Sequence, residues 1–237
     1  MPSPSQQELE GWILLEEGGL LVLDKPSDLP TSGRSLEDPD CLQSLLMQRQ
    51  GAMVWAVHQL DADTSGLNLF VTEKHLVQEF KQRLAWPGCE KRYLAVVHGS
   101  PSWKQLRVEQ PIGTLPLSSP PSLGVIAGGR PSCTRLRVLV RSQGFALLEA
   151  VLETGRTHQI RIHAAHVGHP LVGEEWYRRP ACVLHARQAL HAQGLRFASG
   201  PEPRWLEAPP PLDFLQLCER LALPLPGELR RCRPSRG

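Results

Sequence analysis

Apolar and polar residues alternate over short stretches along most of the chain, and apolar residues at helical spacing occur in only a few places. Alternation over about four to eight residues is typical of half-buried strands, whereas apolar residues three and four positions apart are typical of amphipathic helices. The pattern predicts strands over residues 12–15, 20–24, 54–57, 67–71, 91–97, 134–141, 145–152, 183–186 and 194–197. It predicts helices over residues 41–50, 72–85, 157–167 and 212–223.

Many short strands with irregularly placed helices favour an α+β fold over a regular βαβ alternation. Residues 110–132 are rich in Pro, Gly and Ser, which indicates a long loop or an irregular hairpin within one domain. We expect one domain over residues 12–223, with an N-terminal tail over residues 1–11 and a basic C-terminal tail over residues 224–237. The arginines of the second tail are Arg230, Arg231, Arg233 and Arg236.

Composition narrows the class of protein only a little. A hydrophobic fraction of 41% is ordinary for a globular chain. The longest apolar runs are too short to cross a bilayer, and the first residues do not resemble a signal peptide. Six scattered cysteines without a C-x-x-C pair favour reduced thiols. These features predict a cytoplasmic protein.

The net charge of +2 does not indicate a partner, because a nucleic-acid-binding protein need only concentrate its positive charge on one face. Four pairs of basic residues are candidates for such a face, although each would also suit an ordinary solvated surface. The pairs are Lys81 with Arg83, Lys91 with Arg92, Arg135 with Arg137, and Arg178 with Arg179.

A polar turn over residues 58–66 separates two predicted strands and is the first segment that could carry chemistry. Its residues are also those that any tight turn uses. A calcium loop is a second reading, because Asp61, Asp63 and Ser65 fill its first alternating positions. Thr72 stands where that loop needs a bidentate glutamate, and the flanking segments are predicted strands, so calcium is disfavoured.

The second segment runs from residue 153 to 163, where a glycine leads into a predicted helix with Arg156, His158 and Arg161 in its first turns. Basic side chains at a helix N-terminus suit an anion or a buried carboxylate. Four histidines crowd twelve residues and raise the possibility of zinc: His158, His163, His166 and His169. The chain has no H-E-x-x-H motif and no cysteine spaced to join them, so we expect no metal site.

Taken together, ordered segments of the chain resemble the motifs of the RluA-type pseudouridine synthase family, at spacings that make the match specific. Residues 21–27 resemble its first strand and Asn-Lys-Pro-Ser/Ala turn, 58–66 its H-R-L-D-x-x-T-S-G motif, 91–99 its K-x-Y-x-A-x-V-x-G strand, and 154–173 its T-G-R-T-H-Q-I-R-x-H motif with the G-H-P-I-x-G that follows. The segment Leu184-His185-Ala186 resembles its late L-H-A strand. The resemblance covers roughly residues 20–214.

The resemblance implies a pseudouridine synthase fold, with a mixed, mainly antiparallel sheet, flanking helices and a central RNA-binding cleft. It implies that Asp61 is the catalytic aspartate, that Tyr93 lies against the target base and that Arg161 forms an ion pair with the aspartate. Leu184 matches an apolar residue near the active site. RNA contacts are expected from His58, Gln59, Thr64, Arg156, His158 and Leu184.

The activity implied is the isomerisation of a uridine in structured RNA, either rRNA or tRNA, to pseudouridine. That reaction needs no redox or group-carrying cofactor, and the chain lacks both the P-loop and the G-x-G-x-x-G motif. Some family members carry an N-terminal S4 domain, but only about 20 residues precede the first motif here. No protein partner is evident from the sequence.

Three departures from the family pattern stand out: Asp24 for Asn in the first turn, Gln59 for Arg beside the catalytic position, and residues 174–178 for the usual G-D-x-x-Y-G ending. The last two support an alternative, a catalytically silent RNA-binding protein of the same fold. The presence of Asp61, Tyr93 and Arg161 counts against it, because a silent binder would not need all three.

Overall fold

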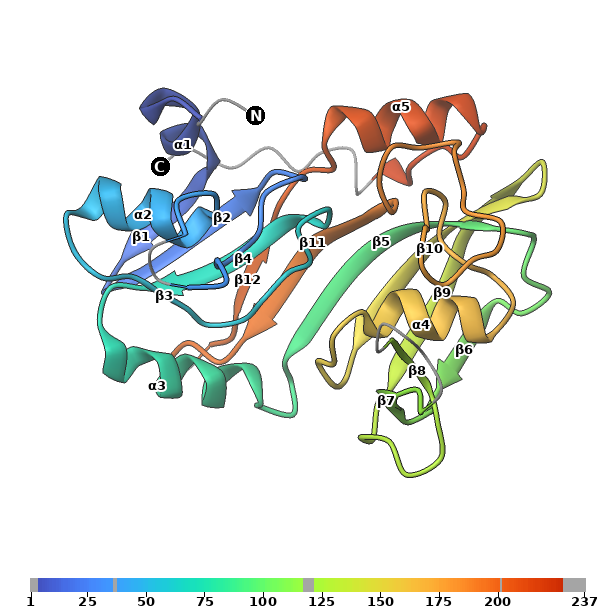
Figure 1. Cartoon of the computed structure of the whole chain (residues 1–237), viewed down its shortest axis with the longest axis horizontal. Coiled ribbons are helices and arrows are strands. Elements are labelled where there is room, and N and C mark those ends of the chain that lie inside the picture. Colours follow the sequence, from blue (N-terminus) through green and yellow to red (C-terminus); the bar gives the residue numbers. More distant parts are fainter. Residues whose placement is uncertain (1–3, 36–37, 117–121, 201, 228–237) are drawn as a thin grey trace. The chain divides into compact units, whose positions relative to one another are not determined.

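The computed structural model describes residues 4–35, 38–116, 122–200 and 202–227 (Figure 1). The arginines of the expected C-terminal tail lie outside these residues. Contacts divide the chain into two compact units, which are described separately below. Of the described residues, unit 1 contains those up to 89 and those of 192–210, and unit 2 contains those of 90–191 and 211–227. The expectation of one catalytic domain over residues 12–223 stays a prediction.

Unit 1 is built on antiparallel strands with helices packed against them. Its helices are α1 (Gln6–Trp12), α2 (Leu42–Gln50) and α3 (Lys74–Leu84). Its strands are β1 (Ile13–Glu17), β2 (Leu20–Lys25), β3 (Trp55–Ala56), β4 (Ser65–Val71), most of β11 (Leu190–Phe197), and β12 (Arg204–Glu207). They follow the order β1-β2-β4-β11, with β3 beside β4 and β12 beside β11.

The central strands of unit 1 are buried on both faces. Leu21 and Leu23 of β2 pack with residues of α1 and α2. Leu20 and Val22 of the same strand pack with Phe80 and other residues of α3. Because side chains alternate along a strand, each face of the sheet receives its own apolar layer.

Unit 2 holds a second group of antiparallel strands, in the order β5-β10-β9-β6. These strands are β5 (Glu90–His98), β6 (Gln105–Val108), β9 (Thr134–Ser142) and β10 (Phe145–Leu152). Strands β7 (Ile112–Thr114) and β8 (Leu123–Val125) pair as a hairpin, which is one of the two alternatives expected for residues 110–132. Residues 117–121 lie outside the described part. The helices are α4 (Gln159–His166) and α5 (Leu212–Arg220).

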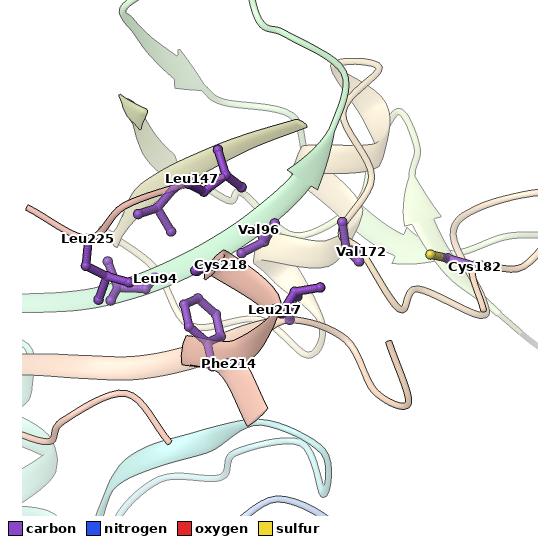
Figure 2. Close-up of a cluster of buried hydrophobic side chains, with 11 residues drawn as sticks. Leu94, Val96, Leu147, Val172, Cys182, Phe214, Leu217, Cys218 and Leu225 are labelled. Atoms are coloured by element: carbon purple, nitrogen blue, oxygen red, sulfur yellow. The ribbon is translucent and has the colours of Figure 1, made fainter. Parts of the chain in front are cut away.

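Helix α5 covers one face of the unit 2 strands. Phe214 and Leu217 of this helix pack with Leu94 and Val96 of β5 and with Leu147 of β10 (Figure 2). Tyr93 lies between Arg92 and Leu94 in β5, so its side chain points to the opposite face of the sheet.

The structure confirms the expected α+β class, with mainly antiparallel strands and irregularly placed helices. One predicted strand is wrong, because no residue of 183–186 is in a strand and residues 184–187 form bends. Val183 is 93% exposed and Leu184 is 45% exposed, so this apolar run has no buried face to stabilise a strand. Helix α1 was not predicted, nor were strands β6 and β12. No helix among the described residues is long and apolar enough to cross a membrane.

Candidate active site

Asp61 lies in the loop between β3 and β4, at the end of a strand pair in unit 1. The loop closes on itself through a hydrogen bond of 3.0 Å from the Thr64 N–H to the Asp61 carbonyl oxygen. Asp61 is half-buried, so its carboxylate has both a protein environment and an approach from solvent. The position is therefore suited to a group that reacts with a bound ligand.

The buried ammonium group of Lys25 ties this loop to the end of β2. Lys25 is 0% exposed, and its Nζ donates to the carbonyl oxygens of Pro26, Leu29 and Ala62 at 2.7, 2.8 and 2.7 Å. Ala62 directly follows Asp61 in the chain. A buried charge that satisfies three carbonyl groups is costly to displace, so Lys25 fixes the loop backbone beside Asp61.

Thr31 and Asn68 hold the other side of the loop. The Thr31 hydroxyl accepts from the Leu60 N–H at 3.0 Å and lies 3.0 Å from the Asn68 Oδ1. Asn68 in turn donates to the His58 carbonyl oxygen at 3.1 Å. Leu60 directly precedes Asp61, so the backbone is anchored on both sides of the aspartate.

The backbone conformation of Gly66 and the strand beside it explain why the turn sequence has a glycine at this position. Its φ is +107°, and a Cβ at this position would lie 2.3 Å from the Ala192 carbonyl oxygen of β11. Only glycine allows this backbone conformation together with the close approach of the neighbouring strand. The glycine therefore lets β4 begin immediately after the Asp61 loop.

The other predicted RNA contacts in unit 1 lie in three different environments. Gln59 is exposed, and its Nε2 donates to the Ser32 hydroxyl at 2.6 Å. The His58 Nε2 accepts from the Leu69 N–H at 3.3 Å, so the ring is engaged with the strand backbone. Thr64 is 2% exposed, and among the described residues its hydroxyl has no hydrogen-bond partner. Their contacts with RNA stay predictions.

Asp24 carries a titratable group at the end of β2, where the resemblance expects asparagine. Burial raises the pKa of its carboxyl to about 7, and the positive charge of Lys25 only partly offsets this effect. The carboxyl therefore changes its charge near neutral pH, next to the lysine that anchors the Asp61 loop.

In unit 2, Arg161 forms a bidentate ion pair with Glu174. The guanidinium Nε and Nη2 donate to the two carboxylate oxygens at 2.9 and 2.8 Å, and the two side chains are 6% and 0% exposed. Burial opposes ionisation of Glu174, but the hydrogen bonds from Arg161 and from the Trp176 and Tyr177 N–H groups outweigh it and lower the pKa. Glu174 therefore holds the guanidinium in a fixed orientation.

Glu174 was missed as a functional residue because the segment 174–178 was read as a departure from the family ending. The sequence does contain a sign of this role, because Glu174 directly follows Gly173, at the position where the family motif has an aspartate. The expected ion pair between Arg161 and Asp61 stays a prediction, because the two residues belong to different units.

Two aromatic residues lie against the Arg161 side chain, and both of them also contact His158. The guanidinium carbon lies 5.2 Å from the Trp176 ring centroid and 5.3 Å from that of Tyr177. The His158 Nδ1 lies 2.7 Å from the Tyr177 hydroxyl oxygen. These contacts join the start of α4 to the loop that follows Gly173.

Other polar residues of the α4 motif hold the helix in place. The Gln159 Nε2 donates to the Cys133 carbonyl oxygen and to the Thr134 hydroxyl, each at 2.9 Å. The His163 ring lies 2.8 Å from the same hydroxyl and 2.9 Å from the Gln110 carbonyl oxygen. Within the described residues, no three His, Cys, Asp or Glu side chains are grouped as metal ligands.

The prediction that residues 184–186 form the late L-H-A strand was wrong. The tripeptide occurs twice, as residues 184–186 and as Leu190-His191-Ala192, and only the second lies in a strand, β11. Leu190 and His191 are 5% and 0% exposed. The RNA contact predicted for Leu184 stays a prediction.

Three of the four candidate basic pairs contain arginines that are paired with acids. Arg83 lies 2.5 Å from Glu79. The remaining contacts are Arg92 with Glu90 and Glu149, Arg135 with Glu153, and Arg137 with Glu149. Neither Arg178 nor Arg179 has an ion pair within the part of the chain that the structure describes. Of the arginines in these four pairs, those without a described acidic partner therefore lie in the loop beside Tyr177.

Comparison with known proteins assigns the family. Residues 19–166 match the family model described as RNA pseudouridylate synthase. The chain is 34% identical to ribosomal large subunit pseudouridine synthase D of Nitrosomonas europaea, over 88% of this chain and 64% of that protein. It is 32% identical to dual-specificity RNA pseudouridine synthase RluA of Vibrio cholerae, over 89% of this chain and 86% of that protein.

The solved structure of human RNA pseudouridylate synthase domain containing 1 is similar, with 27% identity and a TM-score of 0.67 over 83% of this chain and 82% of that one. The chain spans 73% of the length of one curated relative and as little as 55% of another. The chain belongs to the RNA pseudouridylate synthase family, whose members are isomerases that convert uridine in RNA to pseudouridine. The family and the fold class expected from the sequence are confirmed.

Proposed function

We propose that this chain isomerises a uridine in structured RNA, either rRNA or tRNA, and that Asp61 is the catalytic carboxylate. The observation that carries the proposal is the anchored loop around Asp61, with Lys25 bonded to Ala62 on one side and Thr31 bonded to Leu60 on the other. A reacting carboxylate must be held in place, because a small displacement costs a large part of the rate.

The chemistry requires one carboxylate and no group carrier. The N-glycosidic bond of the uridine breaks, the uracil rotates, and carbon 5 of the base bonds to the sugar in place of nitrogen 1. Nitrogen 1 gains a proton, and carbon 5 releases its own proton to solvent, so the reaction is balanced without a cofactor. Asp61 acts in its ionised form, either by attack on the sugar or by taking a proton from it.

Two further side chains have proposed roles in the same reaction. The target base is stacked in folded RNA and must be flipped out before it can react. Tyr93 then provides an aromatic face against the base. Arg161, oriented by Glu174, stabilises the ionised form of Asp61.

Ribosomal RNA is the first substrate class to test, because a relative 34% identical to this chain is named for the large ribosomal subunit. The tRNA class remains the second candidate. An enzyme that modifies either of these RNAs would act in the cytoplasm.

The test is release of tritium from transcripts labelled at carbon 5 of uridine, with large-subunit rRNA and tRNA assayed in parallel. We expect release above background from at least one of the two. RNA that is bound without any release of tritium would contradict the proposal and favour a silent RNA-binding protein.

A further inference from the structure

Trp176 is a large aromatic residue that the fold leaves exposed beside Arg161. Its exposed fraction is 62%, whereas that of the other exposed tryptophans in the described residues, Trp86 and Trp205, is 37%. The exposed part of this ring gives no stability to the folded chain, and tryptophan is among the residues enriched at binding interfaces.

The ring is nevertheless held in a fixed place. The backbone N–H of Trp176 donates to the Glu174 Oε1 at 3.0 Å, and that carboxylate is completely buried, so the main chain that carries the ring is anchored. The ring lies edge-on to His158, with centroids 5.0 Å apart, and the Arg161 guanidinium lies 5.2 Å from its centroid. An aromatic ring held this way loses little conformational freedom when a ligand stacks on it.

The charges near this ring favour a polyanion. Arg178 and Arg179 follow Trp176 by two and three residues. Arg156 lies two residues before His158, the N-cap of α4, which contacts this loop. In the described part of the chain, none of these three arginines has an acidic partner. By contrast, Arg135 and Arg137 of β9 are bonded to glutamates and offer little net charge to RNA.

We propose that Trp176 is a stacking platform for an unpaired base of the RNA substrate, next to the flipped uridine. The inference rests on the proposed function, because it takes Arg161 as part of the active site. Stacking on an aromatic ring accepts any base, and the neighbouring arginines contact the phosphates on either side. The platform holds the RNA strand next to the position from which the target uridine has been flipped out.

The experiment measures RNA affinity in an Asp61→Asn parent, so that binding is separated from turnover. The probes are in vitro transcripts of bacterial large-subunit rRNA and of tRNA. Trp176 is replaced by Phe, which can stack, and by Leu, which is apolar but has no ring to stack. Trp86→Leu is the matched control, because Trp86 is also an exposed ring that lies near an arginine, 5.8 Å from Arg196.

We expect Trp176→Leu to weaken binding roughly tenfold or more, and Trp176→Phe and Trp86→Leu to change it less than about threefold. The slope of affinity against salt should stay the same in Trp176→Leu, because no phosphate contact is removed. Thermal unfolding of each variant checks that the fold is retained.

The platform is refuted if Trp176→Leu binds as tightly as the parent, or if Trp176→Phe is as weak as Trp176→Leu. A parent that binds neither transcript contradicts both the platform and the proposed function. If the unmutated chain releases no tritium but Trp176→Leu still weakens binding, the proposed function fails and the platform stands.

Discussion

Among the departures from the family pattern, Gln59 lies nearest to Asp61 in the sequence. It is exposed and bonded to the Ser32 hydroxyl, so it does not form part of the buried network that anchors the loop. An arginine here would add a charge that can reach phosphate, whereas glutamine can only exchange neutral hydrogen bonds.

We therefore expect Gln59→Arg to retain pseudouridine formation and to steepen the salt dependence of RNA binding by about one phosphate contact. The measurement compares affinities across a salt series for both forms. Gln78→Arg on α3 is the control, because it adds the same charge away from the loop. Gln43→Arg would not serve, because the Gln43 amide donates a hydrogen bond to the Val54 carbonyl oxygen. Equal slopes for Gln59→Arg and the original chain would make Gln59 a passive residue.

Asp24 makes stability depend on pH near neutrality. Because burial raises the pKa of its carboxyl to about 7 in the folded state, folding favours the protonated form. The stability from this group is fully present below its unfolded pKa of about 4 and is lost as the pH rises through about 7.

Asp24→Asn keeps the shape and removes the titration, so it should raise the free energy of unfolding at pH 8 but hardly at pH 4. The expected gain is on the order of 1–4 kcal/mol, since each pH unit between the two pKa values is worth about 1.4 kcal/mol. Urea unfolding at both pH values measures it, with the exposed Asp28→Asn as control. The same gain at both pH values would exclude Asp24 as the titrating group.

At the scale of elements, the Arg161–Glu174 pair joins helix α4 to the loop after Gly173. Both side chains are almost completely buried, so loss of one charge leaves the other without compensation. Breaking such a pair costs about 3–5 kcal/mol.

Glu174→Gln should therefore lower the free energy of unfolding by about that amount at pH 7 and reduce turnover. Because the folded pKa of Glu174 is lowered, the pair stabilises the fold above the ordinary glutamate value of 4.5, and the loss should shrink at lower pH. Urea unfolding measures it against Glu175→Gln, an exposed neighbour. A loss no larger than that of the control would show that the pair does not stabilise the fold.

The elements that the sequence predicted are those with a clear buried face. Strands β4 and β10 and helix α3 bury apolar residues at the expected spacing, and their limits agree within a few residues. The edge strand β6 was missed because two of its four residues are exposed. Helix α1 had a signal that was overlooked, since Ser5 and Glu8 form a capping box.

At the scale of the whole molecule, motif resemblance identified candidate residues in both units but not the contacts around them. The roles of Lys25 and Asn68 depend on carbonyl groups that come close only in the folded chain. Sequence also could not show which arginines have acidic partners, because Arg137 and Glu149 meet through the register of β9 and β10. Pattern predicts which residues are buried, whereas tertiary pairing decides which charges remain available to RNA.

The central claim is that Asp61 carries the reaction, and a single-turnover comparison of Asp61→Asn with Asp63→Asn tests it most directly. Both changes remove one carboxylate from the same loop, and both residues are half-buried. Tritium release and RNA affinity are measured for each on the transcript that the unmutated chain modifies. We expect Asp61→Asn to bind RNA with nearly unchanged affinity and to release no tritium, while Asp63→Asn keeps most of the rate. Release by Asp61→Asn near the rate of the unmutated chain would contradict the account.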